Sequence, residues 1–254
     1  MTWRPRTIAY GDAPSQRVEV WAPRRAHHPP VALVHGGFWR LPHSRRTTWL
    51  LAIDLVRRGH PVANLGYRRV GEGGGFAETT NDVALALETA SAAEGFAGQP
   101  LTLIGHSAGA TLALWLASRA TGTKPAGTAS PGSAVSIAGV VSIAGVVSLG
   151  GLLDLDDAVA RDLGTGAVDA FVSPEQRPSL SPIELPCPVP VLVVHSRDET
   201  VVPFDQAERY CERHPAQAEL VAVTGSHRAM LVPRGPGWRR ACSFVDGEVH
   251  PPSS

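Results

Sequence analysis

The sequence predicts an α/β fold, with a mostly parallel, twisted sheet of about eight strands and helices on both faces. Short apolar or alternating runs, typical of strands, alternate along the chain with longer amphipathic stretches typical of helices. The 254 residues, 43% of them hydrophobic, suit one large domain with a substantial core. We therefore expect a single domain over residues 1–246 and a flexible tail over 247–254.

The predicted strands are of two kinds. The stretch RVEVWAP at 17–23 alternates polar and apolar residues, as a half-buried strand does. The others are short, mainly apolar runs, which fit strands covered on both faces. They lie at 31–37, 61–67, 101–107, 189–196 and 218–223.

Helices are predicted between these strands, at 47–60, 80–93, 108–120, 205–213 and 237–245. In the first helix, Trp49, Ile53 and Val56 share one face, and Gly59 stands where the helix should end. The second is expected to begin near a Thr/Asn cap. Strands that alternate with helices in this way form a parallel sheet, and reactive groups gather at the carboxyl ends of its strands.

One hexapeptide is repeated: SIAGVV occupies 136–141 and recurs at 142–147. Two copies are too few for a solenoid, so we expect one copy to form a buried strand and the other to lengthen it or to bulge. The sequence leaves open which copy forms the strand. The surrounding run of 20 uncharged residues, 134–153, could span a bilayer, but it is rich in Gly, Ser and Val and lacks flanking basic residues. We expect no membrane partner.

Composition argues against several classes of function. A net charge of zero and a pI near 7.2 give no electrostatic basis for binding nucleic acid. The three cysteines, an odd number without metal-ligand spacing, suit a reducing compartment and no disulfide framework. The stretch MTWRPRTIAY lacks the apolar centre of a secretory signal. We expect a cytoplasmic protein with no metal and no cofactor, and the choice between monomer and homodimer stays open.

The carboxyl ends of three predicted strands carry a hydroxyl, a carboxylate and an imidazole. Ser107 ends LTLIGHS, Asp198 follows VLVVHS, and His227 follows ELVAV within TGSH. A serine hydroxyl needs a base within hydrogen-bond reach, and an imidazole base needs a carboxylate to fix its tautomer. The chain order Ser, Asp, His is that of the α/β-hydrolase fold. The sequence therefore predicts Ser107, Asp198 and His227 as a catalytic triad.

Other residues compete for these roles. Glu199, the neighbour of Asp198, is its rival as the acid. The aspartates after the repeat offer a less usual acid: Asp154, Asp156 and Asp157. Two histidines fit the base less well, since one ends a strand and the other a helix: His195 and His214. His227 could itself be a loop histidine without catalytic function, and His35 is expected to hold its own loop through a backbone hydrogen bond.

Small residues surround Ser107 for a physical reason. Gly105 and Gly109 allow a tight strand-to-helix turn in which strand and helix still pack closely. The turn presents Ser107 at a helix N-terminus, where free N–H groups favour negative charge. The N–H of Ala108 is a predicted oxyanion donor for this reason.

The loop sequence HGGFW follows the strand at 31–37 and supplies the other predicted oxyanion donors. These are the N–H groups of Gly37 and Phe38, where glycine allows the backbone to approach closely. Trp39 either lines the substrate pocket or caps the core, and His106, just before the serine, is a further candidate for the pocket.

The combination of HGGFW, GHSAG and DETVVP resembles the α/β-hydrolase superfamily, in particular esterases and arylformamidases of the kynurenine-formamidase type. The resemblance covers nearly the whole chain, and it includes QRVEVWAP, YRRVGEGGGF and GSH. It implies Ser107, Asp198 and His227 as the triad and Gly37, Phe38 and Ala108 as oxyanion donors.

The sequence departs from these relatives at three places. The strand before the acid ends in His195-Ser196 where His-Gly is usual, and Arg228 follows His227 where an apolar or aromatic residue is expected. Arg228 could bind an acidic substrate group or face the solvent. The segment 149–188 matches least and is expected to be a short cap that shapes the substrate pocket.

These features predict a hydrolase that cleaves a small carboxylic ester or an aryl formamide through an acyl-enzyme. Its partner is then a small-molecule ester or amide. A thioesterase or a biosynthetic acyltransferase would use the same triad, and a catalytically silent binding module could share the fold.

Overall fold

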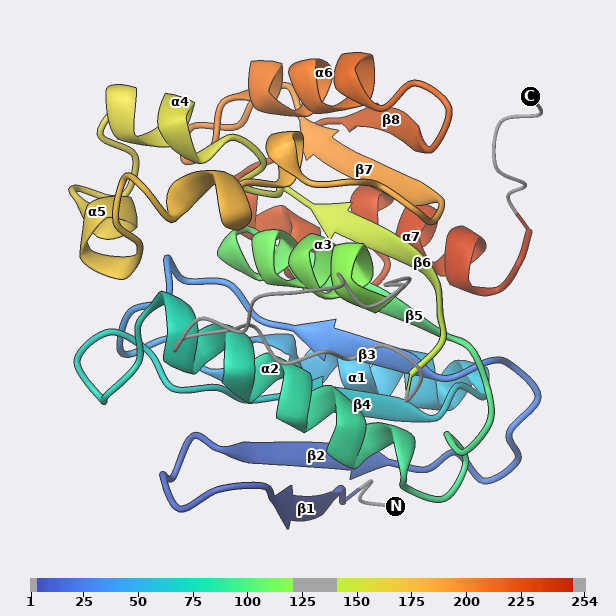
Figure 1. Ribbon diagram of the computed structural model, residues 1–254. Coiled ribbons are helices and arrows are strands. Elements are labelled where there is room, and N and C mark those ends of the chain that lie inside the picture. The colour runs from blue at the N-terminus through green and yellow to red at the C-terminus, as the bar shows by residue number, and fades with distance from the viewer. Residues whose placement is uncertain (1–3, 121–140, 249–254) are drawn as a thin grey trace.

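A computed structural model describes residues 4–120 and 141–248 of the chain. Its centre is an eight-stranded sheet in the order β1-β2-β4-β3-β5-β6-β7-β8 (Figure 1). Strand β2 is antiparallel to β1 and β4, and the neighbours from β4 to β8 are parallel. The strands are β1 (Arg6–Ala9), β2 (Arg17–Trp21), β3 (Val31–Val34), β4 (Val62–Leu65), β5 (Leu101–His106), β6 (Ile143–Leu149), β7 (Val191–Ser196) and β8 (Ala218–Val223).

Helices cover both faces of the sheet, which confirms the predicted α/β fold. Helices α2, α3 and α6 lie on one face, and α1 and α7 lie on the other (Figure 1). The α-helices are α1 (Trp49–Arg58), α2 (Phe76–Ser91), α3 (Ala108–Ala120), α4 (Leu155–Ala160), α5 (Ala167–Phe171), α6 (Phe204–Arg213) and α7 (Pro236–Val245). Short 3₁₀ helices are η1 (Arg45–Thr48), η2 (Arg177–Ser179), η3 (Pro182–Glu184) and η4 (His227–Leu231).

The two faces have separate cores, because successive side chains of a strand point to opposite sides. In β3, Ala32 and Val34 join the core under α2, α3 and α6, while Val31 and Leu33 join the core under α1 and α7. All four residues are buried, which explains why this strand reads as an unbroken apolar run.

Most helix boundaries agree with the sequence. The buried face of α1 and the start of α2 differ from it. Helix α1 ends as expected at Gly59, which has the left-handed φ of +100°. Its buried face, however, is formed by Leu51, Ala52, Leu55 and Val56, and Trp49 is partly exposed. Helix α2 begins earlier than expected, with Gly75 as its N-cap in place of a Thr/Asn cap.

The structure shows one strand that the sequence did not predict, β1, and decides which copy of the repeat forms β6. Strand β1 is short and largely exposed, so it carries no clear apolar pattern, and the sequence did not locate it. The second copy of the repeat forms β6, which answers the question that the sequence left open. The register of β6 against β5 shifts once, between Leu101 and Thr102. Residues 136–140 of the first copy lie outside the described residues.

The segment between β6 and β7 contains α4, α5, η2 and η3. It includes the predicted cap at 149–188. Its helix α4 is tied to α6 through the buried Gln206, whose side chain accepts hydrogen bonds from the N–H groups of Leu153 and Asp154 and donates to Asp157. The cap segment therefore has a fixed anchor on α6.

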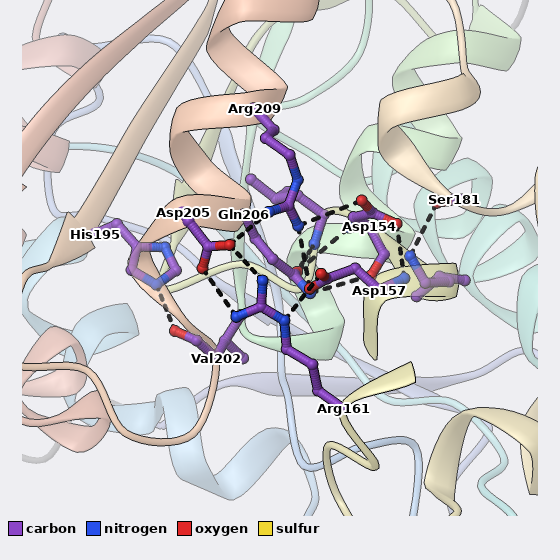
Figure 2. Close-up of polar contacts among 11 residues, drawn as sticks. Asp154, Asp157, Arg161, Ser181, His195, Val202, Asp205, Gln206 and Arg209 are labelled. Carbon is purple, nitrogen blue, oxygen red and sulfur yellow. Dashed lines mark hydrogen bonds and ion pairs between the residues drawn. The ribbon is translucent and has the colours of Figure 1, made fainter. Parts of the chain in front are cut away.

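Charged side chains surround this anchor. Figure 2 shows Arg161 and Arg209 on either side of Asp205, and both arginines also pair with Asp157. Burial works to raise the pKa of Asp205, but the hydrogen bonds from the two arginines outweigh it, and the pKa is lowered. The network fixes the start of α6, which follows directly on the loop after β7.

None of the helices within residues 4–120 and 141–248 combines the length and apolar character needed to cross a membrane. The predicted flexible tail lies mostly outside these residues, since 249–254 are not described. Of the uncharged run 134–153, residues 134–140 are not described, and residues 143–149 form β6.

Candidate active site

Ser107 occupies a strained turn between β5 and α3. Its φ is +54°, in the left-handed region that a residue with a side chain rarely adopts. A Cβ atom at Gly105 would lie 2.4 Å from the Cα of Ala110, and one at Gly109 would lie 2.2 Å from the carbonyl oxygen of Val34. Both glycines are therefore required by close packing, as the sequence indicated. The turn is fixed further by the N–H of Ser107, which donates to the Leu149 carbonyl at 3.0 Å.

His227 begins η4 and points its Nδ1 atom at a carboxylate. The partner is Glu199, whose Oε2 lies 2.8 Å from that nitrogen. The Glu199 side chain is fully buried, and the His227 side chain is 12% exposed. Because a carboxylate only accepts, Nδ1 carries a hydrogen, and in the neutral ring Nε2 keeps its lone pair.

The structure places Glu199, and not the predicted Asp198, against the His227 ring. Asp198 is exposed and its Oδ2 accepts a hydrogen bond from the N–H of Gly225 at 3.1 Å. The Asp198 carboxylate thus bonds to the loop after β8, while the Glu199 carboxylate bonds to the His227 ring. The second oxygen of Glu199 is held too, because Oε1 accepts from the N–H of Val201 at 2.8 Å.

Glu199 stays ionised in this environment. Burial works to raise the pKa of its carboxyl, but the hydrogen bonds from His227 and from the N–H of Val201 outweigh burial, so the pKa is lowered. A lowered pKa in the folded protein means that this contact stabilises the fold at neutral pH and is lost as the pH falls through the lowered value.

Ser107 and His227 line the same cavity, which has a volume of about 570 Å³. Within the described residues no hydrogen bond joins the two side chains. Apolar walls come from Phe38, Val201 and Leu231. The remaining lining residues are Gly36, Gly37, His43, Thr47, His106 and Arg228.

The two residues that the sequence offered for the substrate pocket, His106 and Trp39, lie in different places. His106 lines the cavity, whereas Trp39 does not. Trp39 is fully buried in the core and stacks on Phe171 of α5, with ring centroids 4.2 Å apart. The left-handed φ of +54° turns Trp39 away from the site, so its alternative role as a core residue is the one the structure gives.

The cap segment is also displaced from its expected role. Among the described residues, none from the segment 149–188 lines the cavity. It supports the site from behind, because the Leu149 carbonyl accepts from the Ser107 N–H at 3.0 Å. Farther along, Gly164 packs against the Phe38 ring and accepts a hydrogen bond from Arg40 at 2.9 Å. The walls come instead from the loops after β3, β7 and β8.

The HGGFW loop lies directly against the Ser107 turn. A Cβ atom at Gly36 would lie 2.5 Å from the carbonyl oxygen of His106 and 2.8 Å from the Cβ of Ser107. The next three residues all have a positive φ, +110° at Gly37, +48° at Phe38 and +54° at Trp39. Strain of this kind is maintained only where the surroundings fix it, and it is frequent at functional sites.

Two buried histidines hold the loops around Ser107. His35 donates from Nδ1 to the Gly36 carbonyl at 2.9 Å, as expected of a structural histidine. His106 contacts the backbone carbonyl of His227 through Nε2 at 3.2 Å. Burial lowers the pKa of each ring to about 3, so both are neutral at physiological pH.

One group in the described part of the chain has the residue types of a metal site: His28, His60 and Asp246. It lies before β4, at the opposite edge of the sheet from Ser107. His60 faces the Pro29 carbonyl at 2.7 Å with Nδ1 and the Asp246 carboxylate at 2.8 Å with Nε2. Both contacts have ordinary hydrogen-bond lengths. The group therefore ties the end of α7 to the loop before β3.

Known proteins resemble this chain in sequence and in fold. The model of the BD-FAE family matches residues 19–213 of the chain. A probable isoprenylcysteine alpha-carbonyl methylesterase (ICME) of Oryza sativa subsp. japonica is 33% identical over 115 residues, which cover 42% of this chain and 27% of that protein. The match thus spans little more than a quarter of that relative's length.

Several solved structures share the fold. A truncated carbohydrate esterase from gut microbiota has a TM-score of 0.74 at 15% identity, over 98% of this chain and 96% of its own. Esterase B from Lactobacillus rhamnosis has a TM-score of 0.74 at 15% identity, over 97% and 86%. An esterase of Thermogutta terrifontis has a TM-score of 0.69 at 17% identity, over 98% and 96%. At these identities the likeness shows the α/β-hydrolase fold alone.

Proposed function

The chain belongs to the BD-FAE family, and from this we propose that it is a serine esterase. Ser107 is the nucleophile, His227 the general base and Glu199 the carboxylate that orients it. One observation carries the proposal: the hydroxyl and the imidazole line one cavity, and the other ring nitrogen of the imidazole rests on a buried carboxylate.

In the proposed reaction the Ser107 hydroxyl attacks the ester carbonyl and His227 takes its proton on Nε2. The alcohol leaves with that proton, and water then hydrolyses the acyl-enzyme by the same route. In free enzymes the hydrogen bond between nucleophile and base is often long, and it tightens when substrate binds. The Glu199 carboxylate fixes the tautomer of His227 and stabilises the imidazolium.

The N–H groups of Gly37, Phe38 and Ala108 are the proposed donors to the oxyanion. Gly37 and Phe38 belong to the loop that packs on Ser107, and Ala108 is the first residue of α3. The first N–H groups of a helix have no partner within it, so they are free to bind negative charge.

The position of this loop predicts a measurable effect. Gly36→Ala should lower kcat by roughly a hundredfold, because its methyl group would push the loop off Ser107 and misplace the donors by a fraction of an ångström or more. Steady-state kinetics with a short-chain aryl ester measures this. The control is Gly75→Ala, at an extended residue where the new methyl meets only the Glu78 side chain. Equal kinetics of both variants would contradict the proposed oxyanion site.

We propose a small carboxylic ester as the substrate, since the cavity is compact and largely apolar. An aryl formamide is the second candidate, favoured by the resemblance of HGGFW to arylformamidases. A thioester or a non-water acyl acceptor would use the same residues.

Relative values of kcat/KM distinguish these substrates. We expect short-chain aryl esters to exceed N-formyl-kynurenine by a hundredfold or more, which corresponds to about 2.7 kcal/mol of differential transition-state binding. A hundredfold preference for the formamide would make the protein an arylformamidase. Faster turnover with a carrier thioester or an added alcohol would instead favour the thioesterase or acyltransferase interpretation.

A further inference from the structure

The cavity that holds Ser107 has one permanent charge among its lining residues, and that charge is Arg228. Arg228 follows His227 in η4, on the wall that also includes Leu231. Its side chain is exposed, so it stands at the opening of the cavity and not in the core. Ser107 and Arg228 line the same cavity, so a molecule bound there can contact both side chains.

The carboxylates near Arg228 are already engaged elsewhere. Glu199 is fully buried behind the His227 ring, and Asp198 accepts from the N–H of Gly225. Over residues 4–120 and 141–248, Arg228 has no ion pair or hydrogen bond, and none of the lining residues is acidic. Its guanidinium therefore has no ion-pair partner among the described residues and is available to a ligand.

No other residue that lines the cavity carries a permanent charge. His106 is neutral because burial lowers its pKa to about 3. Phe38, Val201 and Leu231 are apolar and reduce the local dielectric constant, which strengthens the attraction between Arg228 and an anion. A guanidinium also matches the geometry of a carboxylate with two parallel hydrogen bonds.

We propose that Arg228 forms an anion subsite, and that the preferred substrates are esters that carry a second, ionised acid group. The subsite rests on the proposed esterase function and adds the substrate class to it. The acid group belongs either to the acyl part or to the alcohol part of the ester.

Two matched pairs of esters test the subsite. The first pair is the mono-(4-nitrophenyl) ester of adipic acid and its methyl-capped diester, with the carboxylate on the acyl side. The second pair is 4-acetoxybenzoate and methyl 4-acetoxybenzoate, with the carboxylate on the alcohol side. For each pair the measured quantity is the ratio of kcat/KM for the charged ester to that for the neutral ester. The wild type is compared with Arg228→Gln, Arg228→Lys and the control Arg213→Gln, which removes the same charge from the exposed far end of α6.

For at least one pair, we expect Arg228→Gln to lower this ratio about tenfold relative to wild type. Arg228→Lys should retain part of the ratio, and Arg213→Gln should leave it unchanged. Raising the salt concentration should lower the wild-type ratio and have little effect on that of Arg228→Gln.

Two results would overturn the subsite: ratios that are equal in wild type and Arg228→Gln for both pairs, or an equal loss in Arg213→Gln. In either case turnover of the neutral esters would leave the esterase proposal intact. Failure of the wild type to hydrolyse any of the four esters would contradict the esterase proposal itself.

Discussion

Replacing Ser107 by alanine should lower kcat for a small ester by roughly a millionfold, the cost of removing such a nucleophile in other serine hydrolases. Alanine keeps the size of the residue and the left-handed turn but removes the only atom that can form the acyl-enzyme. Some acceleration over water should remain, because the oxyanion donors and the cavity are still present. Single-turnover and steady-state kinetics with a 4-nitrophenyl ester measure the loss.

A matched control comes from the neighbouring strand. Ser148 of β6 is fully buried, and its hydroxyl has no hydrogen-bond partner among the described residues. Ser148→Ala should therefore retain the wild-type kcat. Melting temperatures of both variants separate a lost hydroxyl from a lost fold. A Ser107→Ala protein that keeps its fold and its turnover would exclude Ser107 as the nucleophile.

The second large effect concerns the acid. Glu199→Gln should lower kcat by roughly ten thousandfold, because an amide can present its NH₂ group to Nδ1 and so hold His227 in the wrong tautomer. Asp198→Asn should change kcat by no more than a few-fold, since the Asp198 carboxylate accepts from the N–H of Gly225 and forms no hydrogen bond with the His227 ring. The comparison uses two neighbouring residues and the same chemical change, carboxylate to amide.

The outcome assigns the acid without ambiguity. A large loss in Glu199→Gln alone agrees with the buried contact of 2.8 Å between Glu199 and His227. A large loss in Asp198→Asn alone would return the role to Asp198. The melting temperature of Glu199→Gln is needed beside its kinetics, because this contact also contributes to the stability of the fold at neutral pH.

Much of the site could be predicted because it depends on strand order and small residues. Ser107 and His227 follow the carboxyl ends of β5 and β8, and parallel strands bring such ends to one edge of the sheet. The glycines at 105 and 109 indicated the tight turn, and their contacts with α3 and β3 explain them. These features are set by local backbone requirements, which a sequence pattern carries.

The choice between Asp198 and Glu199 could not be predicted with the same ease. It depends on the direction of each side chain in the turn after β7, and on which carboxylate the turn buries. Both residues have the same chemistry and adjacent positions, so only the three-dimensional path of the turn separates them. The sequence nevertheless offers Glu199 as the alternative to Asp198 for the acid.

The sequence left the role of Trp39 open and misplaced the cap segment for a related reason. The three successive residues with positive φ after Gly36 reverse the loop and direct Trp39 into the core, where it stacks on Phe171. The same stacking packs α5 against this loop. Backbone reversals of this kind depend on tertiary packing and leave no apolar periodicity to detect.

The central claim is that Ser107 forms a covalent acyl-enzyme, and trapping that species tests it most directly. Protein mixed briefly with 4-nitrophenyl acetate and quenched in acid is digested and analysed by mass spectrometry, with Ser107→Ala treated in parallel. We expect one acetyl group on the peptide that contains Ser107, and none on that peptide in the variant. Turnover of the ester with no adduct on Ser107, or an adduct that persists in Ser107→Ala, would contradict the account.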